Sequence, residues 1–411
     1  GDPNCFMDRA LMEGDPFAIL EGMTIGAYAV GAHEGFIYLP YEYTQAVKTL
    51  KNAIKQAREY GLLGKNILGS GLDFDIELRM GARSFVGGES TAIMHAIEGK
   101  ASEPRAKHVH TTDKGLWDRP SCLNNVKTWS IVSEIVLRGG KWFAGIGTKT
   151  STGTQVFSLA GKINTTGLVE VPMGTTVRQL VFDVGGGLPK KRKFKAIQIG
   201  GPSGGVLPDS LLDMPMDYET LAEAGSMMGT GGVVIMDDRT CVVDIARYFL
   251  EFLTDESCGK CTTCREGVRR MLEIMIRITQ GQGKLADLDT LETLARVVHS
   301  VSLCGLGKTA ANPVLSTLRY FRPEYEKHIV DQYCPAGVCK KITSFQIVVD
   351  KCPGCGLCIK ACPEGAITGE KKQPHVIDQT KCLRCGACYD ACNLGAIITT
   401  SRAEMEREVV A

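Results

Sequence analysis

Eight cysteines near the C-terminus stand in two runs of the same spacing, and this repeat constrains the fold more than any other feature. The runs KCPGCGLCIKACPEGAI and KCLRCGACYDACNLGAI correspond position by position. Each follows the C-x2-C-x2-C-x3-C spacing of two-cluster ferredoxins, the second with Asn393 in place of proline. Residues 340–400 are therefore predicted to form a ferredoxin domain that binds two 4Fe-4S clusters.

The shape of a cubane cluster indicates which cysteines share it. Three thiolates of one tight loop can bind three irons, and in two-cluster ferredoxins the fourth cysteine of each run serves the other cluster. The first predicted ligand set is Cys352, Cys355, Cys358 and Cys392. The second set is Cys382, Cys385, Cys388 and Cys362. Zinc is the chemical rival, but the doubled four-cysteine run favours iron and sulfur.

A third 4Fe-4S site is predicted in the segment SCGKCTTCREG, at the start of an expected helix. Cys258, Cys261 and Cys264 would supply three ligands from one loop. Cys304, at the end of a later expected helix, is the candidate for the fourth, because a helical bundle brings helix ends together. The helix N-terminus after Cys264 would direct backbone N–H groups toward an anionic cluster. Zinc, or no metal, is the alternative at this site.

Four of the remaining metal-ligand side chains form a possible zinc site. His328, Cys334 and Cys339 have the spacing H-x5-C-x4-C, and Cys241 is the candidate fourth ligand. Two free buried thiols and a surface histidine are the competing interpretation. Cys5 and Cys122 are interpreted as core or loop thiols.

Composition narrows the class of protein. The chain has 411 residues, and its 47 basic residues are balanced by 46 acidic ones, so the charge pattern indicates no nucleic-acid partner. No apolar run reaches the roughly 18 to 20 residues of a membrane span. Seventeen cysteines, mostly grouped two residues apart, fit metal ligation in a reducing cytoplasm better than a disulfide framework.

The pattern along the chain predicts a multidomain α+β protein. Residues 1–128 alternate helical and extended patterns, as in an α/β domain, and residues 129–203 are rich in β-branched residues and turns. A Gly-rich connection with a strand follows at 204–243, and then a helical bundle at 244–339 that could contain four helices. Residues 340–400 form the ferredoxin domain, and 401–411 a tail.

Several segments outside the ferredoxin repeat resemble one known family. The motifs are CFMDRALMEGDPFAILEGM, GGESTAIMHAIEG, RPSCLNNVKTW, GGPSGG, ESCGKCTTCREG and SLCGLG. They resemble the NADH-binding flavoprotein subunit of respiratory complex I over residues 1 to about 325. The appended ferredoxin is similar to that of the flavin subunits of electron-bifurcating iron-only hydrogenases, and of related formate dehydrogenases and NADP-reducing hydrogenases.

The resemblance implies that residues 1–128 bind FMN and NAD(H), and that the β-rich part is a β-grasp, ubiquitin-like domain. The turn of Gly87, Gly88 and Glu89 would contact flavin and nicotinamide, with Glu89 as the candidate catalytic residue. Asn124 and Asn125 would lie beside the FMN phosphate and ribityl chain, and Asp2 near the nicotinamide. The family's Gly-rich FMN loop is expected upstream of Gly1, so this domain is expected to be incomplete at its N-terminus.

Three positions depart from the family pattern. Phe85 stands where the family usually has tyrosine, Ser90 replaces the second glutamate of the turn, and His110 replaces the phenylalanine that stacks on adenine. An imidazole can also stack, though less strongly. Altered contacts to the nicotinamide cofactor are therefore expected.

The function expected from the resemblance is that of a cytoplasmic flavin subunit in an electron-bifurcating hydrogenase-type complex. Its partners would be a 2Fe-2S thioredoxin-like subunit, a catalytic subunit and ferredoxin. Two alternatives stay open. One is the diaphorase subunit of a non-bifurcating NAD(P)-linked formate dehydrogenase or hydrogenase, and the other is a non-catalytic electron-transfer subunit.

Overall fold

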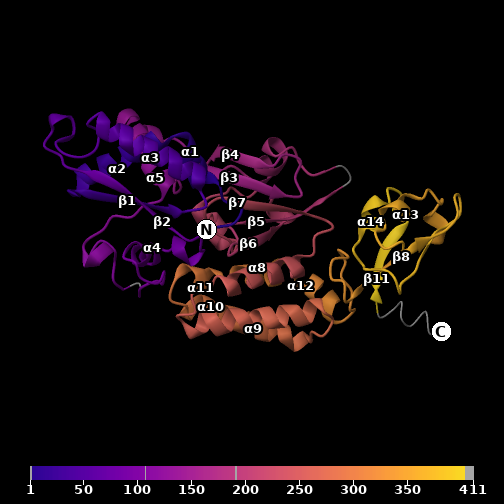
Figure 1. Cartoon of the computed structure of the whole chain (residues 1–411). Coiled ribbons are helices and arrows are strands. Elements are labelled where there is room, and N and C mark those ends of the chain that lie inside the picture. The colour runs from indigo at the N-terminus through magenta and orange to yellow at the C-terminus, as the bar shows by residue number, and fades with distance from the viewer. Residues whose placement is uncertain (1, 107, 190–191, 403–411) are drawn as a thin grey trace.

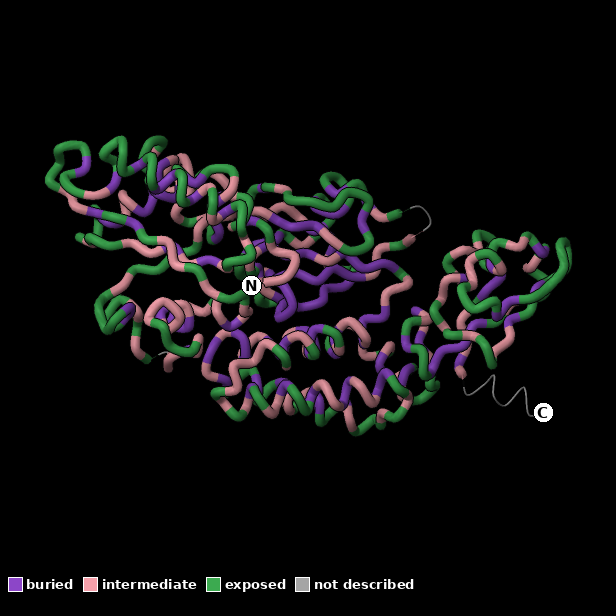
Figure 2. Tube along the Cα trace, in the orientation of Figure 1, coloured by how far each residue is buried: buried purple, intermediate pink, exposed green. Residues whose placement is uncertain are grey.

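The computed structural model describes residues 2–106, 108–189 and 192–402 (Figure 1). An N-terminal α/β unit lies beside a mixed sheet, a helical bundle runs beneath them, and the ferredoxin unit lies at the far end of the bundle (Figure 1). Buried residues concentrate in the mixed sheet and on the inner faces of the bundle helices (Figure 2). Within the tail expected at 401–411, residues 403–411 lie outside the described residues.

The N-terminal unit is built on two parallel strands, β1 (Glu34–Pro40) and β2 (Asp75–Gly81). Its helices are α1 (Met7–Gly14), α2 (Pro16–Val30), α3 (Thr44–Glu59), α4 (Ser90–Ile97), α5 (Val126–Arg138) and α6 (Gly140–Ala144). Helix α2 begins where the Asp15 side chain accepts a hydrogen bond from the Ala18 N–H, and it ends at Gly31 in the left-handed conformation. These boundaries match the local sequence signals for a helix.

Helix α5 lies in a region where the β-branched composition predicted strands, and that prediction was wrong. The helix packs on α2, where Gly22 allows close approach: a Cβ at that position would lie 1.8 Å from the backbone oxygen of Trp129. Asn125 caps the helix by accepting from the N–H of Lys127. Burial against α2 therefore outweighs the modest strand preference of its Ile and Val residues.

The mixed sheet has five strands in the order β4-β3-β7-β5-β6. They are β3 (Thr154–Gly161), β4 (Gly167–Pro172), β5 (Phe194–Ile199), β6 (Gly205–Pro208) and β7 (Gly232–Asp237). Strands β3 and β7 are parallel neighbours, and the other pairs are antiparallel. The strand expected within the Gly-rich connection at 204–243 is β7, the central strand of this sheet. The β-rich unit therefore continues past residue 203, where its end was expected. A π-helical turn at Gln179–Val184 lies between β4 and β5.

Four long helices form the bundle, with a short fifth helix at one end. They are α8 (Val242–Asp255), α9 (Thr262–Thr279), α10 (Leu285–Val301), α11 (Gly305–Thr309) and α12 (Asn312–Ile329). Helix α9 packs on α8 and α10, and α12 packs on the same two helices. Helix α12 also covers the edge strand β6, where the N–H of Val206 donates to Ser316 Oγ at 2.9 Å.

The ferredoxin unit consists of two similar halves. Strand β8 (Thr343–Ile347) pairs with β11 (Ile397–Ser401), and β9 (Ile367–Thr368) pairs with β10 (Val376–Ile377), both antiparallel. Each cysteine run enters a five-residue helix, α13 (Leu357–Ala361) or α14 (Ala387–Ala391). The glycine before each helix, Gly356 or Gly386, is left-handed, which turns the loop back over its own cysteines.

Candidate functional site

Four bundle cysteines line one hollow. Cys261 caps the N-terminus of α9, Cys264 lies in its first turn, and Cys304 caps α11 after the end of α10. The hollow is lined by Cys258, Cys261, Cys264, Cys304, Ser257, Lys260, Leu303, Leu306, Val86 and Pro104. This donor set fits a 4Fe-4S cluster, because four thiols from two loops meet at the first turn of α9.

The surroundings set the proton affinity of these thiols. Burial raises the pKa of Cys264 to about 11, and the neighbouring cysteine thiolates add to the shift. Burial likewise raises the pKa of Cys304. For Cys261 burial is outweighed by hydrogen bonds from backbone N–H groups, including that of Leu303, so its pKa is lowered. Metal binding here would therefore release protons from at least two thiols.

The turn expected to contact flavin lies directly against this hollow. The N–H of Phe85 donates to Glu256 Oε2 at 2.8 Å, and the Phe85 ring packs edge-on against Phe252 at 5.7 Å between centroids. Val86, the next residue, lines the cysteine hollow itself. The bundle loop reaches back as well, since Lys260 Nζ donates to the carbonyl oxygen of Pro104 at 3.0 Å. The N-terminal unit and the bundle thus meet at the cluster site.

Glu89 serves as the N-terminal cap of helix α4. Its Oε2 accepts from the N–H groups of Thr91 and Ala92 at 2.9 and 3.1 Å, and from Thr91 Oγ1 at 2.5 Å. Gly87 is fixed by a hydrogen bond from its N–H to Ser84 Oγ, whereas Gly88 is exposed. Ser90 is the first residue of α4. The turn is therefore held rigidly, with its exposed backbone at Gly88.

Asp2 lies in a buried corner between the mixed sheet and the GGPSGG loop. Its Oδ2 accepts from Thr230 Oγ1 at 2.5 Å, while Oδ1 is buried with no hydrogen-bond partner among the described residues. Gly201 packs directly against this carboxylate, because a Cβ at that position would lie 2.3 Å from Asp2 Oδ1. Burial raises the pKa of Asp2. An unpartnered buried oxygen is what the amide of a bound nicotinamide could satisfy, so the corner fits that ligand.

The other predicted cofactor residues are engaged within the chain or exposed. Asn125 Nδ2 donates to Asp8 Oδ2 at 2.9 Å, and Asn124 Nδ2 donates to Cys122 Sγ at 3.3 Å. His110 is exposed. The asparagine pair lies at the N-terminus of α5, where it would have to exchange these hydrogen bonds in order to contact FMN.

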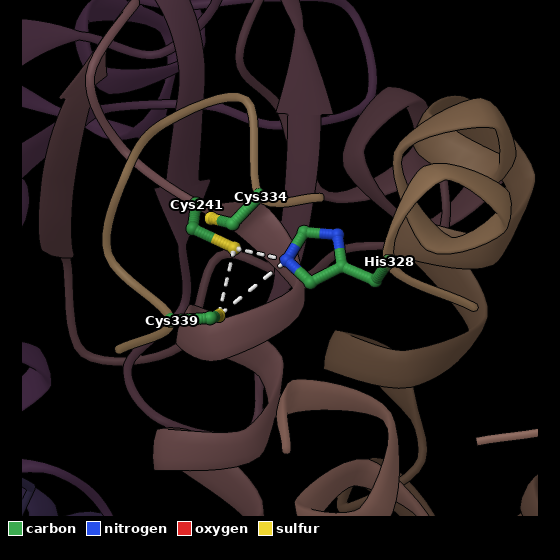
Figure 3. Close-up of side chains that lie close together, drawn as sticks. All are labelled: Cys241, His328, Cys334 and Cys339. Carbon is green, nitrogen blue, oxygen red and sulfur yellow. Dashed lines mark hydrogen bonds between the residues drawn. The ribbon is translucent and has the colours of Figure 1, made fainter. Parts of the chain in front are cut away.

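The four residues grouped as a zinc site converge in the structure, with their side chains pointing toward one another (Figure 3). All four are buried, and their ligand atoms lie within 4.8 Å of one another: Cys241 Sγ, His328 Nε2, Cys334 Sγ and Cys339 Sγ. Nε2 of His328 lies 3.3 Å from Cys241 Sγ and 3.4 Å from Cys339 Sγ. Three thiols and one imidazole in a closed, buried set fit a structural zinc ion.

A second layer of contacts orients this histidine. His328 Nδ1 lies 2.7 Å from the carbonyl oxygen of Glu324, one helical turn earlier in α12. Because a carbonyl only accepts, Nδ1 carries the proton and Nε2 presents its lone pair to the thiols. Hydrogen bonds from neighbouring thiols lower the pKa of Cys334. For Cys339 the hydrogen bond with Cys241 lowers the pKa, but the hydrogen bond with Cys334 and burial together raise it.

The ferredoxin unit has a hollow between its two halves. The cysteines that line it are Cys362, Cys382, Cys385 and Cys388. Phe345, Ile367 and Ile377 enclose it with apolar side chains. One cysteine of the first run thus joins three of the second. Burial raises the pKa of Cys358, and the nearby Cys352 and Cys355 add to this shift.

Comparison with known proteins matches each of these regions. The FMN-binding domain of Nuo51 matches residues 1–134, the NADH-ubiquinone oxidoreductase-F iron-sulfur binding region matches 244–328, and a 4Fe-4S dicluster domain matches 351–397. The NADP-reducing hydrogenase subunit HndC of Solidesulfovibrio fructosivorans is 53% identical over 91% of this chain and 76% of that protein. The chain belongs to the family of NADH-quinone oxidoreductase flavoprotein subunits.

Other relatives agree with this assignment. An NADH-quinone oxidoreductase subunit of Rhizobium meliloti is 42% identical over 82% of this chain and 80% of that protein. The crystal structure of an NAD+-reducing NiFe-hydrogenase in the H2-reduced state matches with a TM-score of 0.72 and 30% identity over 80% of this chain. The chain spans about half of that hydrogenase chain, 55% of its length.

The family assignment makes this chain a flavoprotein subunit of the NADH-dehydrogenase type, with an FMN-binding region followed by iron-sulfur regions. Within the part of the chain that the structure describes, no helix has the length and apolar character of a membrane span. Sequence reasoning missed Glu256, Gly201 and Thr230. Glu256 and Gly201 do lie in the motifs ESCGKC and GGPSGG, but a motif does not state which distant residue its side chains contact.

Proposed function

We propose that this chain is the flavin subunit of a hydrogenase-type complex that exchanges electrons between NAD(P)H and partner subunits. The observation that carries the proposal is the position of Val86, which directly precedes the turn expected to hold flavin and nicotinamide and lines the bundle cysteine hollow. When bound, FMN accepts a hydride as an electron pair and delivers single electrons to 4Fe-4S clusters.

The residues of the chain supply positioning in this proposal. Glu256 and Phe252 hold Phe85, just before the turn of residues 87–89, against the bundle, and Asp2 with Gly201 forms the corner assigned to nicotinamide. Glu89 remains the candidate catalytic residue, although its carboxylate caps α4. The parallel central strands β3 and β7, with antiparallel pairs on either side, support the ubiquitin-like assignment of the mixed sheet.

Three 4Fe-4S clusters are proposed, one in the bundle and two in the ferredoxin unit, with the ligand sets given above. One zinc ion is proposed between Cys241, His328, Cys334 and Cys339. A cytoplasmic location is proposed because these thiolates require reducing surroundings. Electron bifurcation, a 2Fe-2S thioredoxin-like subunit, a catalytic subunit and ferredoxin as partners are proposed from the 53% identity to a hydrogenase subunit.

Purification of the native complex under anaerobic conditions tests this proposal. We expect FMN fluorescence after acid release, iron sufficient for three filled clusters, and a hydrogenase catalytic subunit among the co-purifying chains. Reduction of the iron-sulfur absorbance by NADH and NADPH separately identifies the nicotinamide. A metal-replete preparation without FMN would contradict the flavin assignment, and a formate dehydrogenase subunit in place of hydrogenase would change the complex but not the flavin chemistry.

A further inference from the structure

The two halves of the ferredoxin unit differ at one buried position beside the cysteines. Cys352 corresponds to Cys382 in the repeat, and at the same offset Phe345 corresponds to His375. Both side chains are buried, with 1% and 2% of their surface exposed. Phe345 lies in the middle of β8, opposite Thr399 of β11, whereas His375 directly precedes β10. A repeat that keeps all its ligands has thus exchanged a phenyl ring for an imidazole.

His375 directs its ring at one cluster ligand. Its Nδ1 lies 3.2 Å from Cys358 Sγ, and both atoms are buried. A thiolate bound to iron has no proton to give, so the hydrogen bond requires the proton on Nδ1 and His375 is the donor. Gly369 makes room for the ring, since a Cβ there would lie 2.4 Å from His375 Cδ2.

The equivalent contact in the other half is apolar. Phe345 lines the hollow formed by Cys362, Cys382, Cys385 and Cys388, and its ring has no donor to offer their sulfurs. Hydrogen bonds to cluster sulfurs, together with net charge and solvent exposure, set the reduction potential of a 4Fe-4S cluster. A donor stabilises the more negatively charged, reduced form more than the oxidised form, because its attraction grows with the charge on sulfur.

We propose that His375 is a positioning residue that raises the reduction potential of the cluster bound by Cys352, Cys355, Cys358 and Cys392 above that of its twin. This inference rests on the proposed function, which supplies the two clusters. At equilibrium an electron in the ferredoxin unit therefore resides preferentially on the cluster next to His375. Phe345 leaves the twin site at a lower potential.

Three variants of the full chain test the inference by potentiometric titration followed with electron paramagnetic resonance. His375→Phe copies the other half and removes the donor. His375→Asn keeps an N–H near the position of Nδ1, and Phe345→His introduces a donor in the other half. Iron content is measured for each preparation, and the bundle cluster serves as the internal reference.

We expect His375→Phe to lower the reduction potential of one ferredoxin cluster by about 59 mV, which is about a tenfold change in the equilibrium constant of a one-electron couple. His375→Asn should restore most of that shift, and Phe345→His should raise the other couple. An unchanged couple in His375→Phe, or equal shifts in His375→Phe and His375→Asn, would overturn the inference while leaving the clusters in place. Wild-type protein without iron at these sites would instead overturn the proposed function. If the His375→Phe variant does not assemble its clusters, Phe345→His becomes the deciding variant. An unchanged reduction potential of the other ferredoxin cluster in Phe345→His would then count against the inference.

Discussion

The N–H of Phe85 donates to Glu256 Oε2 at 2.8 Å, although the two residues lie 171 positions apart in the chain. Phe85 lies two residues before the turn proposed to contact flavin and nicotinamide, and Glu256 lies two residues before Cys258, the first cysteine of the bundle loop. One hydrogen bond therefore ties the turn to the loop that carries the cluster ligands. In the proposed function, we expect electron transfer from the turn to the cluster site to depend on this contact.

Replacement of Glu256 tests that contact. We expect Glu256→Ala to lower the free energy of unfolding by about 1.5–3 kcal/mol, the usual worth of a hydrogen bond to a charged group, and to slow reduction of the iron-sulfur absorbance by NAD(P)H. Urea unfolding and stopped-flow absorbance measure the two effects. Glu256→Gln keeps an acceptor oxygen and should lie near wild type. Identical behaviour of the alanine and glutamine variants would show that the hydrogen bond does not hold the turn.

The local cysteine spacing was enough to predict where the iron-sulfur regions lie, because each run places three ligands in one loop. The family models match these regions at 244–328 and 351–397. The Phe85–Glu256 contact could not be predicted in this way, since no local pattern states which distant loop a backbone N–H will meet. It follows from the docking of one unit on another.

Helix α5 shows a second limit of sequence reasoning. Its Ile and Val residues favour strands locally, but Gly22 in α2 opens a groove that only the folded chain reveals. The proposed zinc site could be predicted from the sequence only in part. Its histidine and two cysteines were grouped by spacing, whereas Cys241 was inferred from the unassigned cysteines, and the structure brings all four ligand atoms within 4.8 Å of one another.

Metal analysis tests the zinc proposal. We expect one zinc per chain in addition to iron, and we expect Cys334→Ser to lose the zinc but keep the iron. Structural zinc sites bind with about 10–16 kcal/mol in small peptides at neutral pH, so the zinc-free variant should unfold at a clearly lower temperature. Cys122→Ser, which alters an exposed thiol, is the matched control. Iron in place of zinc at full occupancy would refute the assignment.

The ferredoxin unit contacts the mixed sheet through a small charged cluster. Asp390 Oδ1 accepts from Arg192 Nη2 at 3.2 Å and also from Arg239 Nη1, and the Arg239 guanidinium lies 3.9 Å from the centroid of the Tyr389 ring. The Asp390 side chain is 62% exposed, so each ion pair is worth only about 0.2–1 kcal/mol and is weakened by salt.

We expect Asp390→Ala to loosen the docking of the ferredoxin unit. Small-angle X-ray scattering should give a larger radius of gyration, and trypsin should cleave the segment 331–342 faster. High salt should produce the same change in wild type and little further change in the variant. Glu370→Ala removes an exposed carboxylate from the same unit and should have no effect. Salt-independent docking in wild type would rule out these ion pairs as its basis.

The buried corner at Asp2 predicts a particular dependence of stability on pH. Burial raises the pKa of Asp2 above its usual 3.8, and the hydrogen bond from Thr230 opposes the shift only in part. The folded state therefore holds this proton more tightly than the unfolded state. Its contribution to the free energy of unfolding is complete below pH 3.8 and is lost as pH rises through the raised pKa.

Asp2→Asn removes this titration, because an amide stays neutral at every pH. We expect the variant to be more stable than wild type at neutral pH and to lose that advantage as the pH falls toward 3.8, with urea midpoints measured along the pH series. Its affinity for the nicotinamide should fall at the same time, because Asp2 Oδ1 can no longer accept as a carboxylate. Asp209→Asn, at an exposed position, should show neither change. A stability difference that grows toward acid pH would contradict the raised pKa, because only a group with a lowered pKa loses stability in that direction.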